Sequence, residues 1–305
     1  MTETKIDSSL RLRIKSALIF VPAVLLLLWA GSYPFTIMMA AGAVVAAFEW
    51  SRMVLTGKHP PRLLTRLAAA FCGIAVLFCG MLTDNLGFVK NPVLGFWFLL
   101  ALCFPLYAYN FTHKGPKLRQ LVFGVLYIGF AMNVMVWIRN GSADGLFHML
   151  SLMFIVWASD TCAYFSGKAI GGPKLAPRIS PKKTWAGFFG SSIGAGLVAA
   201  ALACPWVLTK FNVHTVGDMG QTGYFALGFV LAMFGQAGDL FISIFKRFYG
   251  VKDTGTLIPG HGGILDRIDA LLLVALLFGI VAMVMPPAPP LSNAPPFAIE
   301  SPRRP

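Results

Sequence analysis

The sequence predicts an all-α, polytopic integral membrane protein with about nine transmembrane helices and a cytoplasmic N-terminus. Two features of composition support this class: 57% of the 305 residues are hydrophobic and only 12% are charged. Soluble domains carry roughly 25% charged residues, so a water-soluble globular protein and a disordered chain are both excluded. A third observation, the one-sided distribution of Lys and Arg, predicts the orientation.

A membrane-spanning helix requires about 20 apolar residues, and apolar stretches near this length recur along the chain. The first is expected to be a retained helix, because no small-residue cleavage site of a signal peptide follows it. The nine expected spans are approximately 16–32, 34–55, 65–82, 93–110, 119–138, 146–166, 186–208, 222–244 and 265–285.

The net charge of +13 has a source other than nucleic-acid binding. With the N-terminus inside, the alternating spans place 20 of the 25 Lys and Arg residues on the cytoplasmic side. Cytoplasmic loops of membrane proteins collect basic residues as a topology signal. We therefore expect no nucleic-acid partner, and a cytoplasmic location for the basic loops.

We divide the chain into three parts. Residues 1–140 hold the first five helices, residues 141–285 hold the last four helices with the most unusual polar loops, and residues 286–305 form a proline-rich tail that we expect to be disordered. The five cysteines lie in or beside apolar stretches without a CxxC pair, so no disulfide framework and no zinc site are expected.

Acidic residues inside the predicted spans are candidates for function, because an ionised Asp at the centre of a membrane helix costs about 2.5–3.5 kcal/mol. Glu49 stands three residues before Arg52, a spacing that allows a local ion pair at the membrane interface. Asp160 either makes hydrogen bonds to a neighbouring helix or belongs to a site, since a basic loop follows it.

Two further groups of polar residues are spaced for a shared helical face. Asp239, Ser243 and Lys246 form the first group, and Asp266 and Asp269 form the second. Two carboxylates held together in a low dielectric repel each other, and hard divalent cations bind carboxylate oxygens. A metal ion is therefore expected beside this pair, because Arg267 is expected to lie on another side of its helix.

Two basic segments flank these acids. The segment 167–187 contains three prolines together with the basic residues Lys168, Lys174, Arg178, Lys182 and Lys183. It is either a simple topology anchor or a shaped loop for an anionic ligand. The second segment leads through Pro259-Gly260-His261-Gly262-Gly263 into the helix of Asp266.

Glycine-rich backbone before a helix start exposes N–H groups that suit a phosphate. His261 is either a polar loop residue or a contact for phosphate or metal. Carboxylates, bases and a phosphate-sized turn on one side of the membrane indicate phosphoryl or nucleotidyl transfer, in which two metal ions can clamp the entering and leaving oxygens.

These residues resemble the phosphatidate cytidylyltransferases, also called CDP-diacylglycerol synthases. The resemblance is carried by Ser243-Ile244-Phe245-Lys246-Arg247, Lys252-Asp253, and the run from Pro259 to Asp269. The upstream stretches Asp160-Thr161-Cys162-Ala163-Tyr164-Phe165 and Lys174 to Thr184 also resemble family motifs. Ala186 departs from the pattern, since relatives often carry Glu or Gln there.

The resemblance implies a reaction of CTP with phosphatidate that yields CDP-diacylglycerol and pyrophosphate. It implies that Asp239, Asp266 and Asp269 are catalytic and hold Mg²⁺, with K⁺ as a candidate second metal. It also implies a homodimer in the bacterial inner membrane with the site facing the cytoplasm. The substrate-binding residues expected from the motifs are Asp160, Ser180, Lys182, Lys183, Ser243, Lys246, Arg247, Lys252, His261, Gly262, Gly263 and Arg267.

Two other functions fit some of these features. A secondary transporter also carries intramembrane carboxylates, although transport sites lie near the midplane on broken helices. A CDP-alcohol phosphotransferase also acts on lipid head groups, but its DGxxAR core is missing, since Asp144-Gly145 is followed by Leu-Phe-His-Met.

Overall fold

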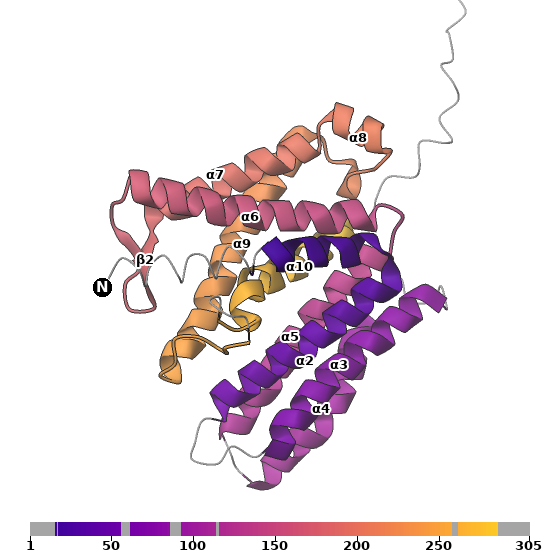
Figure 1. Cartoon of the computed structure of the whole chain (residues 1–305), viewed down its shortest axis with the longest axis vertical. Coiled ribbons are helices and arrows are strands. Elements are labelled where there is room, and N and C mark those ends of the chain that lie inside the picture. Colours follow the sequence, from indigo (N-terminus) through magenta and orange to yellow (C-terminus); the bar gives the residue numbers. More distant parts are fainter. Residues whose placement is uncertain are drawn as a thin grey trace, which may run out of the picture.

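The fold is described from a computed structural model that covers residues 16, 18–55, 62–85, 93–113, 116–257 and 262–285. Helices account for nearly all of it (Figure 1). After an apolar helix at Leu18–Trp29, the helices are α2 (Ser32–Val54), α3 (Arg62–Asn85), α4 (Val93–His113), α5 (Pro116–Asn140), α6 (Gly145–Ala169), α7 (Trp185–Leu202), α8 (Pro205–Phe211), α9 (Gln221–Phe248) and α10 (Leu265–Val284). A 3₁₀ turn, η1, covers Val216–Asp218.

Each expected span overlaps a helix. Among the residues that the structure describes, seven helices are long and apolar enough to cross a membrane, and they lie within α2, α3, α5, α6, α7, α9 and α10. The other two expected spans correspond to the shorter apolar stretches Leu18–Trp29 and Leu94–Phe104. The prediction of an all-α polytopic membrane protein is confirmed, because long hydrophobic blocks satisfy their backbone groups within helices.

The helices form two packed groups that meet at α10 (Figure 1). Helices α2, α3, α4 and α5 pack against one another, and α6, α7 and α9 form the second group. Helix α10 contacts α9, α5, α6 and α2, and it therefore joins the two. The division that we place near residue 140 falls at the turn between α5 and α6, and it stays a prediction.

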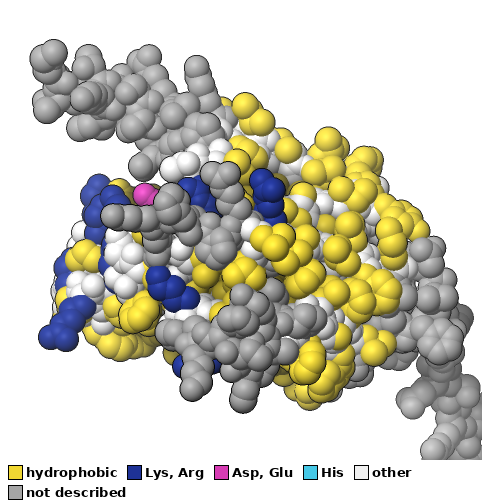
Figure 2. Space-filling model, turned by 90° about the horizontal axis from the view of Figure 1, so that it is seen from below, with side chains coloured by type: hydrophobic (Ala, Val, Ile, Leu, Met, Phe, Trp, Pro, Cys, Tyr) yellow, Lys and Arg dark blue, Asp and Glu magenta, His cyan; other side chains and the backbone are white. Residues whose placement is uncertain are grey.

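The surface carries many exposed apolar side chains, for example Trp29 at 72% and Ile37 at 61% exposure. Figure 2 shows hydrophobic side chains over a broad part of one face, with Lys and Arg gathered to one side. An apolar expanse of this extent is unusual for a soluble monomer and suits contact with lipid. All five cysteines are free thiols.

Two local features differ from the expectation. The span expected at 186–208 ends at Leu202, and Pro205 begins the separate helix α8 at its first turn. A proline has no N–H and clashes with the carbonyl four residues earlier, so α7 cannot continue through it.

The proline-rich basic segment after α6 contains a short antiparallel hairpin. Its strands are β1 (Lys174–Ala176) and β2 (Ser180–Thr184), with Lys174 opposite Thr184 and Ala176 opposite Ser180. The Thr184 side chain then accepts a hydrogen bond from the Gly187 N–H at 3.1 Å and caps α7. The hairpin thus returns the chain directly from α6 to α7.

Candidate functional site

A polar cavity of about 370 Å³ lies among α6, α9, α10 and the segment before α10. It gathers side chains that are far apart in the sequence. Its lining contains Asp160, Asp239, Lys246, Asp253, Asp266, Arg267 and Asp269. Four aspartates predicted from the sequence therefore share one cavity with two cations.

Helix α9 supplies one wall through the face predicted for it. The Ser243 hydroxyl donates to Asp239 Oδ1 at 3.2 Å, and Lys246 follows one turn later with only 9% exposure. Lys183 reaches from strand β2 and places its Nζ 2.6 Å from Asp239 Oδ2. The basic hairpin is thereby tied to the membrane helix that carries Asp239.

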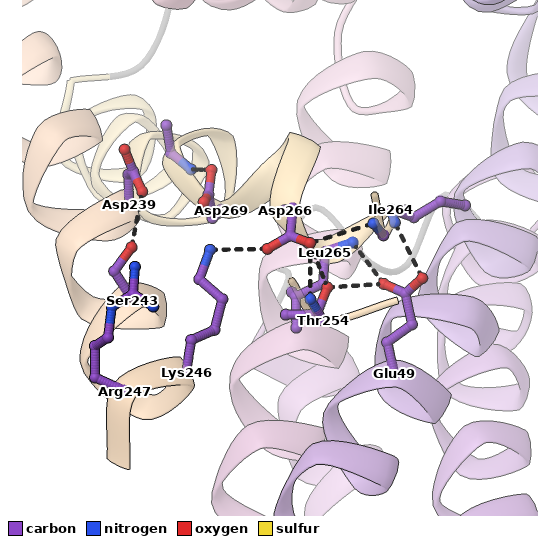
Figure 3. A network of polar contacts seen from close by, with 12 residues as sticks. Glu49, Asp239, Ser243, Lys246, Arg247, Thr254, Ile264, Leu265, Asp266 and Asp269 are labelled. Atoms are coloured by element: carbon purple, nitrogen blue, oxygen red, sulfur yellow. Dashed lines mark hydrogen bonds and ion pairs between the residues drawn. The ribbon is translucent and has the colours of Figure 1, made fainter. Parts of the chain in front are cut away.

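Helix α10 supplies Asp266 in its first turn, and this carboxylate is the best connected in the site (Figure 3). Its Oδ1 accepts from Lys246 Nζ at 2.8 Å. Its Oδ2 accepts from the backbone N–H groups of Thr254 at 2.8 Å and Gly263 at 3.2 Å, and from the Thr254 hydroxyl at 3.0 Å. These contacts fix both carboxylate oxygens.

Asp269 lies one turn further along α10 and is only 7% exposed. Its Oδ1 accepts from the Ala270 N–H at 2.8 Å. Arg267, which was expected on another side of the helix from the two aspartates, also borders this cavity. The cavity extends over more than one side of the first turn of α10, so residues 100° apart on the helix reach it.

The remaining predicted residues that the structure describes are not among those that line this cavity. Lys182 and Lys252 are exposed, and Ser180 is half-buried at the start of β2. Arg247 is exposed and donates from Nε to the Ile179 carbonyl at 3.2 Å, which joins α9 to the hairpin. His261 lies outside the described residues, and its role stays a prediction.

The glycine turn before α10 shows an arrangement that the sequence did not predict. The N–H of Gly263 donates to Asp266, and those of Ile264 and Leu265 donate to Glu49 at 3.1 and 2.9 Å. Carboxylates of the protein therefore accept the hydrogen bonds of these amides. The role of Gly262 and Gly263 in binding phosphate stays a prediction.

Glu49 and Thr254 are the site residues that sequence reasoning missed. Within the described part of the chain, no ion pair joins Glu49 to Arg52, so the expected local pair is wrong. Arg52 instead lies over the Phe48 ring, 5.9 Å from its centroid. The sequence did offer one indication. Helix α10 begins at Ile264-Leu265 after two glycines, and none of these side chains can accept a hydrogen bond from the first amides of the helix, so an acceptor from elsewhere is required.

The carboxylates were also predicted to hold a metal ion. Among the residues for which the structure gives positions, no three His, Cys, Asp or Glu side chains stand close enough to hold one ion together. Asp239 and Asp266 are instead paired with Lys183 and Lys246. The site is thus a shared acidic cavity without a preformed three-ligand cage, and the metal assignment stays a prediction.

Comparison with known proteins agrees with the motifs. Residues 11–285 match the profile of the cytidylyltransferase family. A phosphatidate cytidylyltransferase of Brucella suis is 33% identical over 273 residues, which cover 88% of this chain and 92% of that protein. A protein of the same name from Haemophilus influenzae is 34% identical over 283 residues, with 86% and 94% covered. With a match over most of its length and relatives above 30% identity, the chain belongs to the cytidylyltransferase family.

Proposed function

We propose that this chain is a phosphatidate cytidylyltransferase, which transfers the cytidylyl group of CTP to phosphatidate and releases pyrophosphate. The names of relatives that align over most of its length support this substrate pair. The product, CDP-diacylglycerol, is a precursor for phospholipid synthesis.

The observation that carries the proposal is the joint lining of one cavity by Asp160, Asp239, Asp266 and Asp269 with Lys246 and Arg267. A nucleoside triphosphate is bound by cations and by carboxylate-held metal together, and this cavity offers both kinds of group. Helix α10 begins at this cavity, with Asp266 in its first turn, and this position suits a reaction between a soluble nucleotide and a lipid.

The donor set fits Mg²⁺ by its chemistry. Carboxylate oxygens are the preferred ligands, and Mg²⁺ at phosphate-transfer sites needs only one or two carboxylates besides substrate phosphates and water. Asp239, Asp266 and Asp269 would hold it, with K⁺ as a candidate second cation. When bound, the metal would neutralise charge on the phosphates of CTP.

The reaction forms one P–O bond and breaks another. A phosphate oxygen of phosphatidate attacks the α-phosphorus of CTP, and the bond from that phosphorus to the bridging oxygen of the β-phosphate breaks. Lys183, Lys246 and Arg267 lie where they can hold the negative charge that accumulates on the departing pyrophosphate. Asp266 holds the Lys246 ammonium in place, and Asp266 and Asp269 would together position the metal ion.

We further propose that the chain lies in the bacterial inner membrane with this cavity on the cytoplasmic side. The support is the distribution of Lys and Arg, since the two predicted inside segments from Lys168 to Lys183 and from Lys246 to Arg267 carry nine of the 20 bases assigned to the inside. A homodimer, which the resemblance implies, belongs to the same proposal.

The test is an assay of the purified full-length chain in mixed micelles with phosphatidate and radiolabelled CTP. We expect CDP-diacylglycerol and pyrophosphate in equal amounts with Mg²⁺, and no product with ATP in place of CTP. Folded protein that forms no CDP-diacylglycerol at any Mg²⁺ concentration would overturn the proposal. Solute flux in vesicles without CTP turnover would favour a transporter instead.

A further inference from the structure

We propose that Glu49, on α2, is a positioning residue of the active site that caps the helix carrying Asp266 and Asp269. This inference rests on the proposed function for its kinetic part. It begins from a deficiency of α10: the residue at its N-cap is Ile264, whose side chain cannot accept a hydrogen bond. The first N–H groups of a helix have no partner within the helix, so α10 needs an acceptor from elsewhere.

Glu49 supplies that acceptor from 215 residues away in the sequence (Figure 3). Its Oε1 lies 3.1 Å from the Ile264 nitrogen, and its Oε2 lies 2.9 Å from the Leu265 nitrogen. Glu49 is only 5% exposed. A buried carboxylate at this position is stabilised by two charge-assisted hydrogen bonds and by the positive end of the helix dipole.

Thr254 couples this cap to the catalytic carboxylate. Its hydroxyl lies 3.2 Å from Glu49 Oε2 and 3.0 Å from Asp266 Oδ2. A hydroxyl has one proton, so it donates to one of the two carboxylates at a time. Any displacement of Glu49 therefore changes the hydrogen bonding of Asp266, whose other oxygen accepts from Lys246.

Two glycines leave the space that the Glu49 carboxylate occupies. A Cβ atom at Gly263 would lie 2.5 Å from Glu49 Oε2, and one at Gly255 would overlap Glu49 Oε1. Both distances are shorter than atoms tolerate, so any larger residue would push the carboxylate away. The glycine next to α10 thus has a steric role in admitting Glu49.

Helix α2 holds Glu49 in a fixed position against α9 as well. Trp50 is fully buried, donates from Nε1 to the Gln120 carbonyl at 3.0 Å, and packs edge-on against Phe245 with ring centroids 4.8 Å apart. The Tyr249 hydroxyl donates to the Gln120 side-chain oxygen. Burial raises the pKa of the Tyr249 hydroxyl. The N-terminal helices therefore form part of the scaffold of the site.

Removal of the Glu49 charge should alter the rate more than substrate binding. In Glu49→Gln the side chain keeps one acceptor oxygen, so one of the two amides faces an NH₂ group in place of an acceptor, and the start of α10 shifts. A misplaced catalytic group lowers kcat, because it affects alignment in the transition state more than the affinity of the ground state. Loss of a supporting contact of this kind costs about 10–100-fold in activity.

The experiment compares wild type, Glu49→Gln and Arg52→Gln as purified full-length chains. We expect Glu49→Gln to lower kcat about 10–100-fold, with KM for CTP within about twofold of wild type. Hydrogen exchange should accelerate in the peptide 262–270, which contains the capped amides, and remain unchanged in α7. Arg52→Gln should match wild type in every readout, because its exposed side chain lies one turn from Glu49 and outside the network.

Wild-type kcat and wild-type exchange in Glu49→Gln would overturn the proposal. So would an equal loss in Arg52→Gln, because it would assign Glu49 to a local ion pair. If Glu49→Gln does not fold, slow exchange of the Ile264 and Leu265 amides in wild type supports the cap, and fast exchange contradicts it. A folded wild type without CTP turnover defeats only the proposed function, since the exchange measurement still tests the cap.

Discussion

Replacement of Asp266 by asparagine tests the site at its best-connected carboxylate. Asparagine has the same shape but only one acceptor oxygen in place of two. If that oxygen faces Thr254 and Gly263, the new NH₂ group faces the Lys246 ammonium, 2.8 Å away in the native pair. If it faces Lys246, the NH₂ group meets two N–H donors. Either orientation loses a hydrogen bond to a charged group, worth about 1.5–3 kcal/mol.

The effect on turnover should be larger than the effect on stability. Asp266 is proposed to hold Mg²⁺ beside the phosphates of CTP, and such a contact contributes about 3–4 kcal/mol to the transition state. We therefore expect Asp266→Asn to lower kcat by about 10²–10³-fold. The assay is the initial rate of CDP-diacylglycerol formation, with thermal unfolding recorded by intrinsic fluorescence on the same preparation.

The matched control is Asp144→Asn. Asp144 lies at the N-terminus of α6, 16 residues before Asp160 and outside the cavity. Asp144 Oδ2 lies 3.0 Å from His214 Nδ1, so its replacement should lower Tm. Its turnover per folded molecule should stay within about twofold of wild type. A folded Asp266→Asn protein with a rate within about threefold of wild type would refute the role given to Asp266, as would an equal loss in Asp144→Asn.

Three other outcomes follow from the structure. Lys183→Met should raise KM for CTP about tenfold in steady-state assays, because Asp239 loses the ammonium 2.6 Å from its Oδ2 and a base proposed to bind phosphate is removed. Gly124→Ala should lower Tm, because the added Cβ would overlap the buried Trp50 side chain, at a cost of about 1–3 kcal/mol. The control Gly42→Ala, between the same two helices, adds a Cβ that makes only an ordinary 3.7 Å contact and should leave Tm unchanged. Removal of divalent metal with EDTA should abolish turnover and added Mg²⁺ should restore it; full activity after chelation would contradict the metal assignment.

The membrane helices could be predicted because their signal is local. Twenty apolar residues in a row have few alternatives to a helix in a bilayer, so seven of the expected spans correspond to helices long and apolar enough to cross a membrane among the described residues. The shared faces of Asp239 with Ser243 and of Asp266 with Asp269 followed from helical spacing alone. The end of α7 was missed because Pro205 stands close to the end of a continuous apolar run.

The contacts of the site were harder to predict because they cross between elements. Lys183 and Lys246 were assigned to phosphate, while the structure pairs them with Asp239 and Asp266. Periodicity shows which face of a helix a residue occupies but not which helix approaches that face. Glu49 illustrates the limit, since its nearest base in sequence is Arg52 and its actual partners are 205 to 216 residues away.

The cap on α10 also dictates an order of events during synthesis. Glu49 leaves the ribosome long before its partners, and at about 5–20 residues per second the intervening 215 residues take roughly 10–40 s. Through that interval the carboxylate must remain hydrated, protonated or bound to another group within the nascent membrane domain. The cap therefore cannot form before α10 has been synthesised, and a chain interrupted before α10 lacks Asp266 and Asp269 as well.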